Sequence, residues 1–238
     1  QHPLVFQGMQ RVAVAGLAVG LQVFFQLAAP AHFAVDAGDI KLVTVARAAL
    51  GQGHGLLGFL EPKRGSVKIA GRDVRDYSRR ALAAELAYIP QSYSPAFDHT
   101  VLDSVLMGLG AQLGPFDSPS REQTNAALRI LDELGIGALA SRGCMRISGG
   151  ERQLVALTSV LACGPAIVVA DEPTTLLDLG NRLRLRALLD ALPQQVVVST
   201  HDLDLAASAD RVLVVAGGRI VADGSPQESI AFYEASQR

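Results

Sequence analysis

Two buried strands that end in polar side chains constrain the fold of this chain most. Residues 166–170 read Ala-Ile-Val-Val-Ala, a run typical of a strand covered on both faces of a parallel sheet, and Asp171 and Glu172 follow at once. Residues 196–200 repeat the pattern and are followed by His201. Ligands bind at the carboxyl ends of strands in open α/β sheets. We therefore expect these three side chains at one edge of such a sheet.

Two neighbouring carboxylates at that edge suit metal-assisted phosphate chemistry. One carboxylate can hold the water shell of a Mg²⁺ ion, while the other orients or deprotonates a water molecule. Taken alone, Asp171 and Glu172 are explained better by a solvated strand end, and a lone histidine is more often a plain surface or core residue. The order of His201 after the two acids favours the functional interpretation.

A third segment, Ser148-Gly149-Gly150-Glu151, begins a helical pattern. Its serine and glutamate have the spacing of a capping box, in which the serine caps the helix and the glutamate reaches back. The two glycines leave backbone N–H groups unshielded at the positive end of the helix dipole. The segment therefore predicts a helix start and an anion site together.

These segments together resemble the ATP-binding-cassette (ABC) transporter ATPases. Residues 147–153 look like the signature motif of that family, residues 167–172 like its Walker B strand and catalytic glutamate, residues 176–178 like its D-loop, His201 like its switch histidine, and residues 88–91 like its Q-loop. The motifs follow the family's order and cover roughly residues 60–225, which chance does not readily produce.

The resemblance implies an α/β fold with a P-loop NTPase-like core, an antiparallel β-subdomain and an inserted α-helical subdomain at approximately residues 97–147. Residues 1–8 read as the remnant of a protease site ahead of Met9, so we expect a single ABC domain over residues 9–238. The resemblance places residues 11–38 in the β-subdomain.

Residues 12–35 also allow a different interpretation, because they carry no charge and are long enough to cross a bilayer. Gln22, Gln26 and Pro30 within the stretch argue against a membrane span. Strands of the β-subdomain are the interpretation that we favour.

The resemblance also implies a role for each site residue. Glu172 would polarise the attacking water, His201 would hold the γ-phosphate, and Asp171 and Gln91 would arrange Mg²⁺ through water. Two subunits would face each other head to tail, so that each clamps the ATP held by the other. The residues implied in that nucleotide contact are Ser148, Gly149, Gly150, Gln153 and Asp178. ATP and Mg²⁺ are the cofactors implied.

The phosphate-binding loop of the family, G-x-x-x-x-G-K-[ST], is missing from the sequence. Residues Thr44 to Gly55 stand in its place, and they contain no lysine. The family's adenine-stacking aromatic also has no counterpart near Gly20. Three interpretations stay open: a degenerate subunit, a variant loop that binds nucleotide differently, and a sequence error, either a reading-frame slip or wrongly assigned residues. We favour a sequence error, because the family pattern resumes at once in the flanking residues 56–60.

Composition adds few constraints. The formal net charge of -2 gives no indication of nucleic-acid binding. The two cysteines, Cys144 and Cys163, have neither a metal-binding nor a redox-motif spacing, which favours a reduced cytosolic compartment.

The resemblance implies an ATPase that powers a membrane importer from the cytoplasmic face of the membrane. Its partners would be transmembrane permease subunits, a second ATPase subunit (most simply a second copy of the chain) and, indirectly, a substrate-binding protein. Residues 88–119 look like the same segment in ATPases of importers for metal chelates such as ferric siderophores, haem, cobalamin or molybdate. Residues 171–185 look more like energy-coupling-factor ATPases for vitamins and cobalt. We favour metal-chelate import.

The main alternative is a regulatory subunit defective in nucleotide binding. The altered residues 44–55 favour it, whereas the retained Glu172 and His201 oppose it, because a site released from catalysis has no chemical reason to keep both. DNA-repair and ribosome-associated relatives usually carry a coiled-coil insertion or a second cassette, and 238 residues leave no room for either.

Overall fold

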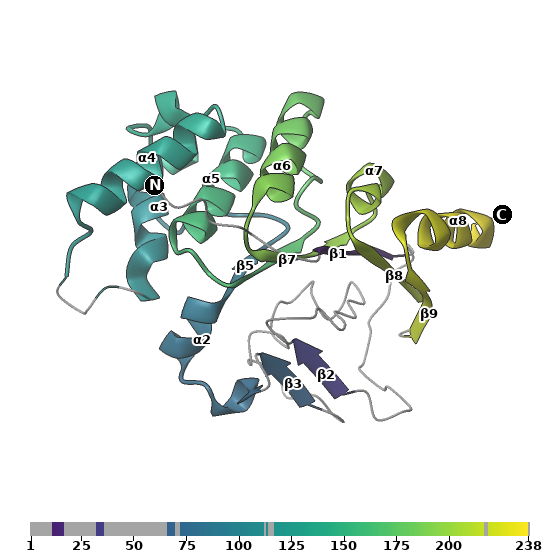
Figure 1. Cartoon of the computed structure of the whole chain (residues 1–238). Coiled ribbons are helices and arrows are strands. Elements are labelled where there is room, and N and C mark those ends of the chain that lie inside the picture. Colours follow the sequence, from purple (N-terminus) through teal and green to yellow (C-terminus); the bar gives the residue numbers. More distant parts are fainter. Residues whose placement is uncertain are drawn as a thin grey trace, which may run out of the picture.

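A six-stranded sheet forms the centre of the computed structural model, which describes residues 11–16, 32–35, 66–69, 72–111, 113, 117–216 and 219–237. The order of its strands is β5-β6-β7-β1-β8-β9 (Figure 1). Their bounds are Leu86–Ile89 (β5), Ile167–Asp171 (β6), Gln195–Thr200 (β7), Arg11–Gly16 (β1), Arg211–Ala216 (β8) and Arg219–Gly224 (β9). All neighbours pair in parallel except β8 and β9, which form an antiparallel hairpin.

A second, three-stranded sheet contains β2 (His32–Val35), β3 (Ser66–Ile69) and β4 (Arg72–Asp73). Strands β2 and β3 pair in parallel, and β3 and β4 pair antiparallel. The small sheet lies on the side of the main sheet opposite helices α5, α6 and α7 (Figure 1). The predicted α/β class with a separate β-subdomain is confirmed. That subdomain was predicted to be antiparallel: β3 and β4 pair in this way, whereas β2 and β3 are parallel.

The strand at residues 11–16 is placed differently from the expectation. We assigned it to the β-subdomain, but β1 pairs with β7 on one side and β8 on the other, inside the main sheet. The residues after Arg11 are uncharged and small or β-branched, which suits a strand paired along both edges. Of the segment 11–38, only β2 belongs to the small sheet.

Side-chain caps define where most helices begin. Thr100, Ser120, Ser148 and Ser225 each form a capping box, and Ser78, Asp178 and Asp202 each accept a hydrogen bond from a first-turn backbone N–H. The helices that follow are α2 (Arg79–Glu85), α3 (Val101–Gly108), α4 (Arg121–Glu133), α5 (Gly149–Ala162), α6 (Leu179–Ala191), α7 (Leu203–Ala207) and α8 (Pro226–Ser236). Single 3-10 turns are η1 (Val74–Asp76), η2 (Leu109–Ala111), η3 (Gly137–Leu139) and η4 (Cys144–Arg146).

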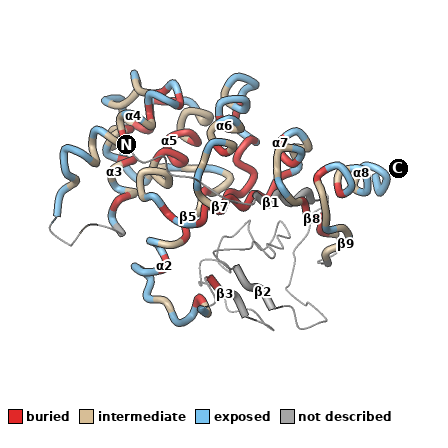
Figure 2. The backbone as a smooth tube through the Cα atoms, viewed as in Figure 1, coloured by how far each residue is buried: buried red, intermediate tan, exposed pale blue. Residues whose placement is uncertain are grey.

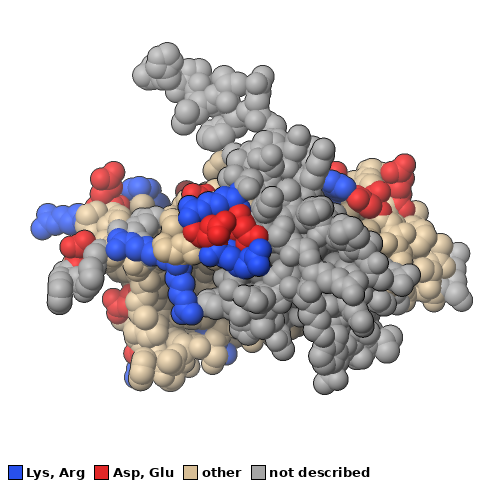
Figure 3. All heavy atoms as spheres, turned by 90° about the horizontal axis from the view of Figure 1, so that it is seen from below, with Lys and Arg blue, Asp and Glu red and all other residues tan. Residues whose placement is uncertain are grey.

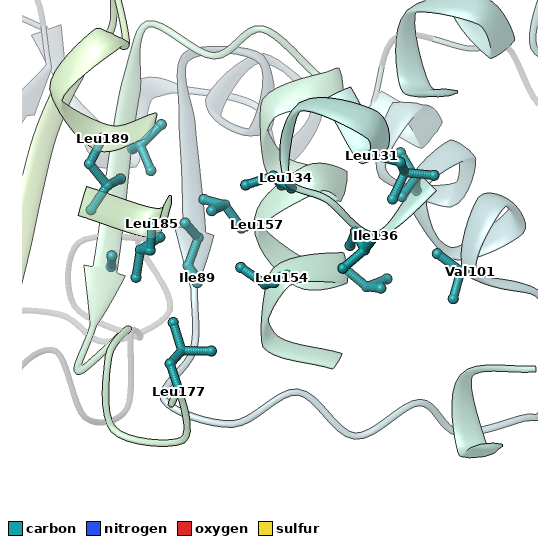
Figure 4. Close-up of a cluster of buried hydrophobic side chains, with 14 of the residues drawn as sticks. Ile89, Val101, Leu131, Leu134, Ile136, Leu154, Leu157, Leu177, Leu185 and Leu189 are labelled. Atoms are coloured by element: carbon teal, nitrogen blue, oxygen red, sulfur yellow. The ribbon is translucent and has the colours of Figure 1, made fainter. Parts of the chain in front are cut away.

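Helix α5 joins the inserted helical subdomain, here called the lobe, which contains α3 and α4, to the main sheet. Helices α3 and α4 both pack on it, and its buried face continues the core of strands β5 and β6 (Figures 1 and 2). The close-up in Figure 4 shows Leu154 and Leu157 of α5 between Leu131 and Leu134 of the lobe and Ile89 of β5. One continuous apolar core therefore fixes the lobe against the strand ends.

The described surface carries mixed charge. In the view of Figure 3, basic and acidic side chains lie next to each other on the described part of that face. Arg75 and Asp73 form an ion pair, with 2.8 Å between Nη2 and Oδ2. In the part of the chain that the structure describes, no helix is both long enough and apolar enough to span a membrane.

Candidate functional site

Strands β6 and β7 bring three predicted residues to one edge of the sheet. Asp171, the last residue of β6, is in register with Ser199 of β7, and the backbone N–H of Glu172 donates to the Ser199 carbonyl at 2.9 Å. His201 follows the end of β7. The parallel register of two buried strands therefore places Asp171, Glu172 and His201 side by side.

Glu172 and His201 are in direct contact. Oε2 of Glu172 lies 2.6 Å from Nδ1 of His201, and the backbone N–H of His201 lies 3.5 Å from the same oxygen. A carboxylate oxygen only accepts, so the contact assigns a proton to Nδ1. The Glu172 side chain is 6% exposed and that of His201 is 55% exposed. A buried carboxylate thus orients an imidazole that reaches the surface.

The backbone of Glu172 is unusual. Its φ of 47° is the one positive value among the described residues other than glycine. Such a conformation costs about 1–3 kcal/mol for a residue with a side chain and persists only where its surroundings enforce it. The turn after β6, which is closed by the Thr175 N–H donating to the Glu172 carbonyl at 3.2 Å, aims the carboxylate at His201.

Asp171 is buried and is approached from strands on both sides. The Ser199 hydroxyl of β7 donates to Oδ1, and the Tyr88 hydroxyl of β5 lies 3.5 Å from Oδ2. Burial raises the pKa of Tyr88, and the negative charge of Asp171 and its hydrogen bond raise that pKa further. The phenol therefore stays protonated and can only donate to the carboxylate. Neither Ser199 nor Tyr88 was singled out from the sequence.

A magnesium ion at this edge would need ligands from nucleotide and water as well as from the protein. Among the described residues, no cluster of three or more His, Cys, Asp or Glu side chains could hold a metal. Mg²⁺ bound with nucleotide needs fewer protein ligands, because phosphates and waters complete its shell. Asp171 offers a carboxylate oxygen of that kind. Gln91 follows the end of β5, the strand next to β6, and so lies at the same edge.

The signature segment forms the N-terminus of α5. The Ser148 hydroxyl accepts from the Glu151 N–H at 3.2 Å, and Oε2 of Glu151 accepts from the Ser148 N–H at 2.7 Å. A side chain at Gly150 would begin 3.2 Å from the Leu176 carbonyl oxygen. Glycine at this position therefore allows the helix start to approach residues 176–178 closely.

Asp178 and Gln153 have structural contacts of their own. Asp178 caps α6, because its Oδ1 accepts from the Asn181 N–H at 2.8 Å. Gln153 is 3% exposed, and its Nε2 donates to the Pro90 carbonyl at 2.8 Å. The sequence suggested a nucleotide contact for Gln153, but its side chain is turned inward and joins α5 to the start of the Q-loop.

The segment that stands in place of the family's phosphate loop lies outside the described residues. That applies to Thr44 to Gly55, to the position near Gly20 where the family's adenine-stacking aromatic was expected, and to residues 1–8, for which a protease-site remnant stays a prediction. The structure does describe Asp171, Glu172, His201 and the signature segment 147–153.

Comparison with known proteins gives consistent matches. The sequence model of the ABC transporter family matches residues 54–175. The chain is 38% identical over 178 residues to the biotin transport ATP-binding protein BioM of Rhizobium etli, covering 74% of this chain and 76% of BioM. It is 35% identical over 190 residues to the hemin import ATP-binding protein HmuV of Bradyrhizobium diazoefficiens, covering 74% and 68%.

A third relative is the cobalamin import ATP-binding protein BtuD of Halobacterium salinarum, with 36% identity over 175 residues, 71% of this chain and 44% of BtuD. Among solved structures, an inward-facing structure described as a metal-chelate type ABC transporter superposes with a TM-score of 0.66 at 24% identity, covering 92% of this chain and 73% of that one. The cbiO1 subunit of Clostridium perfringens gives a TM-score of 0.68 at 22% identity, covering 96% and 82%. At these identities the structural matches speak for the fold alone.

Proposed function

The chain belongs to the ABC transporter ATPase family, and from this premise we propose that it is the ATP-hydrolysing subunit of a membrane importer for a metal chelate such as siderophore iron, haem or cobalamin. The observation that carries the proposal is the contact of buried Glu172 with His201 beside Asp171, at the carboxyl ends of adjacent strands. Relatives named for hemin and cobalamin import support the class of cargo.

The residues of this edge have complementary tasks in hydrolysis. Glu172 orients the attacking water and takes its proton, because a carboxylate held near the γ-phosphate is a suitable general base. His201, whose Nδ1–H donates to Glu172, presents Nε2 to the γ-phosphate, and Nε2 donates to a phosphate oxygen when the ring carries a proton on both nitrogens. Asp171 and Gln91 would hold Mg²⁺ through water, and that ion, when bound, neutralises charge on the phosphates. The Ser199 hydroxyl keeps the Asp171 carboxylate in place.

The signature segment would act on a second copy of the chain. Ser148, Gly149 and Gly150 form a helix N-terminus with unshielded N–H groups, which is suited to an anion supplied by the partner. Closure of the pair around ATP would drive transmembrane permease subunits, and a substrate-binding protein would deliver the cargo to them. The working position would be the cytoplasmic face of the membrane.

A specific observation favours a second candidate cargo. BioM is named for biotin transport, so an energy-coupling-factor ATPase for a vitamin or cobalt is the alternative. A regulatory subunit that does not bind nucleotide is the other alternative, and the altered residues 44–55 favour it.

Calorimetry of Mg²⁺-ATP binding, on protein of verified mass, tests the proposal. We expect saturable binding and, in a Glu172→Gln variant, ATP-dependent dimers that accumulate because hydrolysis no longer separates them. Absence of binding would overturn the ATPase proposal and leave the regulatory subunit. Reconstitution with permeases that carry haem or biotin would then distinguish the two classes of cargo.

A further inference from the structure

The loop at residues 92–98, which follows the Q-loop, is attached to the turn that precedes the signature segment. Oδ1 of Asp98 accepts from the Met145 backbone N–H at 3.0 Å, and Oδ2 lies 3.4 Å from Nε of Arg146. Met145 and Arg146 belong to the single 3-10 turn η4, which ends just before Ile147 and Ser148. One carboxylate therefore joins two segments that are distant in sequence.

Backbone hydrogen bonds continue this attachment on the far side of Asp98. The Cys144 N–H donates to the His99 carbonyl at 2.9 Å, and the Val101 N–H donates to the Arg142 carbonyl at 2.9 Å. Thr100 and Gly143 form an isolated antiparallel bridge between the same two segments. Asp98 thus stands at the signature end of a short ladder and extends it by one side-chain bond.

Gly143 leaves the space that the carboxylate occupies. A Cβ at this position would lie 2.8 Å from Cγ of Asp98 and closer still to Oδ1. The three nearest atoms to such a Cβ all belong to Asp98. A methyl group at residue 143 would therefore displace this side chain in particular.

Pro90 of the Q-loop, just before this loop, is fastened to the signature helix α5. Gln153 of α5 donates to the Pro90 carbonyl at 2.8 Å, as described above. Residues 91–97 therefore span the distance between two attachments, one at Pro90 and one at Asp98, and both lead to the segment that carries Ser148. A displacement of this loop cannot leave the start of α5 unaffected while both attachments hold.

We propose that Asp98 is a positioning residue, which fastens the loop 92–98 to the η4 turn so that Ser148 takes the orientation needed to contact nucleotide on a second copy of the chain. The inference rests on the proposed function, because the orientation of Ser148 has a consequence only if the signature segment meets a nucleotide. Asp98 acts through Met145 and touches no reacting atom.

The test uses the Glu172→Gln protein as parent, with two quantities measured for each variant. One is the affinity of the monomer for Mg²⁺-ATP, and the other is the ATP-dependent monomer–dimer equilibrium by analytical ultracentrifugation. We expect Asp98→Ala to weaken dimer formation by about three- to tenfold for each of the two copies in the dimer, the range of one lost hydrogen bond per copy, while the monomer affinity for ATP is unchanged. A general structural defect would lower both quantities.

Matched variants separate the hydrogen bond from the ion pair. Asp98→Asn keeps an oxygen that accepts from the Met145 N–H, and Arg146→Ala removes only the exposed ion pair, so both should dimerise like the parent. Gly143→Ala should weaken dimers as Asp98→Ala does. In the Asp98→Ala background, however, Gly143→Ala should add nothing, because the atoms it would strike are gone. Additive effects, or full dimerisation of Asp98→Ala, would overturn the proposal.

Amide hydrogen exchange provides a measurement that does not depend on nucleotide. The Met145 N–H should exchange faster in Asp98→Ala than in Asp98→Asn, together with the N–H groups of residues 143–148. If the parent binds no ATP, the proposed function fails, and the exchange result still decides whether Asp98 fastens the turn. Unchanged exchange in Asp98→Ala would contradict the inference even in a protein that hydrolyses ATP.

Discussion

The sheet edge and the signature end differ in how their residues are held. At the sheet edge, Asp171 and Glu172 are buried and are bound by side chains of neighbouring strands. At the signature end, Ser148 is exposed, and its hydrogen bonds run to Glu151 of its own helix. The contacts of Asp171 and Glu172 come from the tertiary fold, whereas the capping hydrogen bonds of Ser148 stay within one helix turn, and the turn that leads into Ser148 is fastened by Asp98. This difference is what a site completed by a second copy of the chain would require.

Glu172→Gln, at the sheet edge, should have the largest effect of any single substitution in the two halves of the site. The amide keeps the shape of the side chain but cannot take a proton from water, so ATP hydrolysis should fall by about 10²–10⁴-fold with little loss of ATP binding. Steady-state phosphate release and calorimetry measure the two quantities. The control is Glu122→Gln on the exposed start of α4, which should hydrolyse ATP normally. If Glu172→Gln kept more than a tenth of the activity, Glu172 would not be the general base.

Ser199→Ala should produce the next largest effect, this time on stability. It takes a hydroxyl donor away from the buried Asp171 carboxylate, which should lower the free energy of unfolding by about 1–3 kcal/mol. Urea denaturation of the nucleotide-free protein measures this. Ser208→Ala, which removes a hydroxyl bonded to the Leu205 carbonyl at the end of α7, is the matched control and should cost less. Equal losses would mean that the sheet edge is held no more tightly than an ordinary helix end.

The sequence predicted the two halves unequally, for a physical reason. Local patterns sufficed for the signature end, because the capping box of Ser148 and Glu151 involves residues of one helical turn. The strands ending at Asp171 and Thr200 were also predicted, since buried parallel strands have a recognisable composition. The partners Ser199 and Tyr88 were not, because a contact between strands depends on their register. A polar serine within the β-branched run 196–200, two residues before His201, was the signal available.

The same reasoning explains the misplaced strand at residues 11–16. Its composition indicated a strand, and the resemblance assigned that strand to the small sheet. Which sheet a strand joins is decided by its neighbours in space, and here these are β7 and β8. Likewise, the inward position of Gln153 follows from how α5 lies against the end of β5, which no local pattern specifies.

Ser148 variants should separate capping from nucleotide contact at the signature end. Ser148→Ala removes the N-cap and should cost about 1 kcal/mol of stability. Ser148→Asp restores an N-cap but places a negative charge at the anion site, so the free energy of unfolding should match the unmodified protein while ATP-dependent dimers of the Glu172→Gln parent are lost. Thermal melts and ultracentrifugation measure the two effects. If Ser148→Asp still dimerised with ATP, the helix N-terminus would not be the phosphate contact.

Glu151→Gln should have the smallest effect and so gives the sharpest test of the comparison. A glutamine oxygen can accept from the Ser148 N–H as the glutamate oxygen does, and capping boxes accept either residue, so the stability change should stay within about 0.5 kcal/mol. Glu151→Ala, which removes the acceptor, is the contrasting variant and should lose more in the same urea titration. If Glu151→Gln destabilised the protein as much as Ser199→Ala, the charged carboxylate of Glu151 would make stabilising contacts outside its own helix turn. The capping box itself would then depend on tertiary contacts, as the sheet edge does.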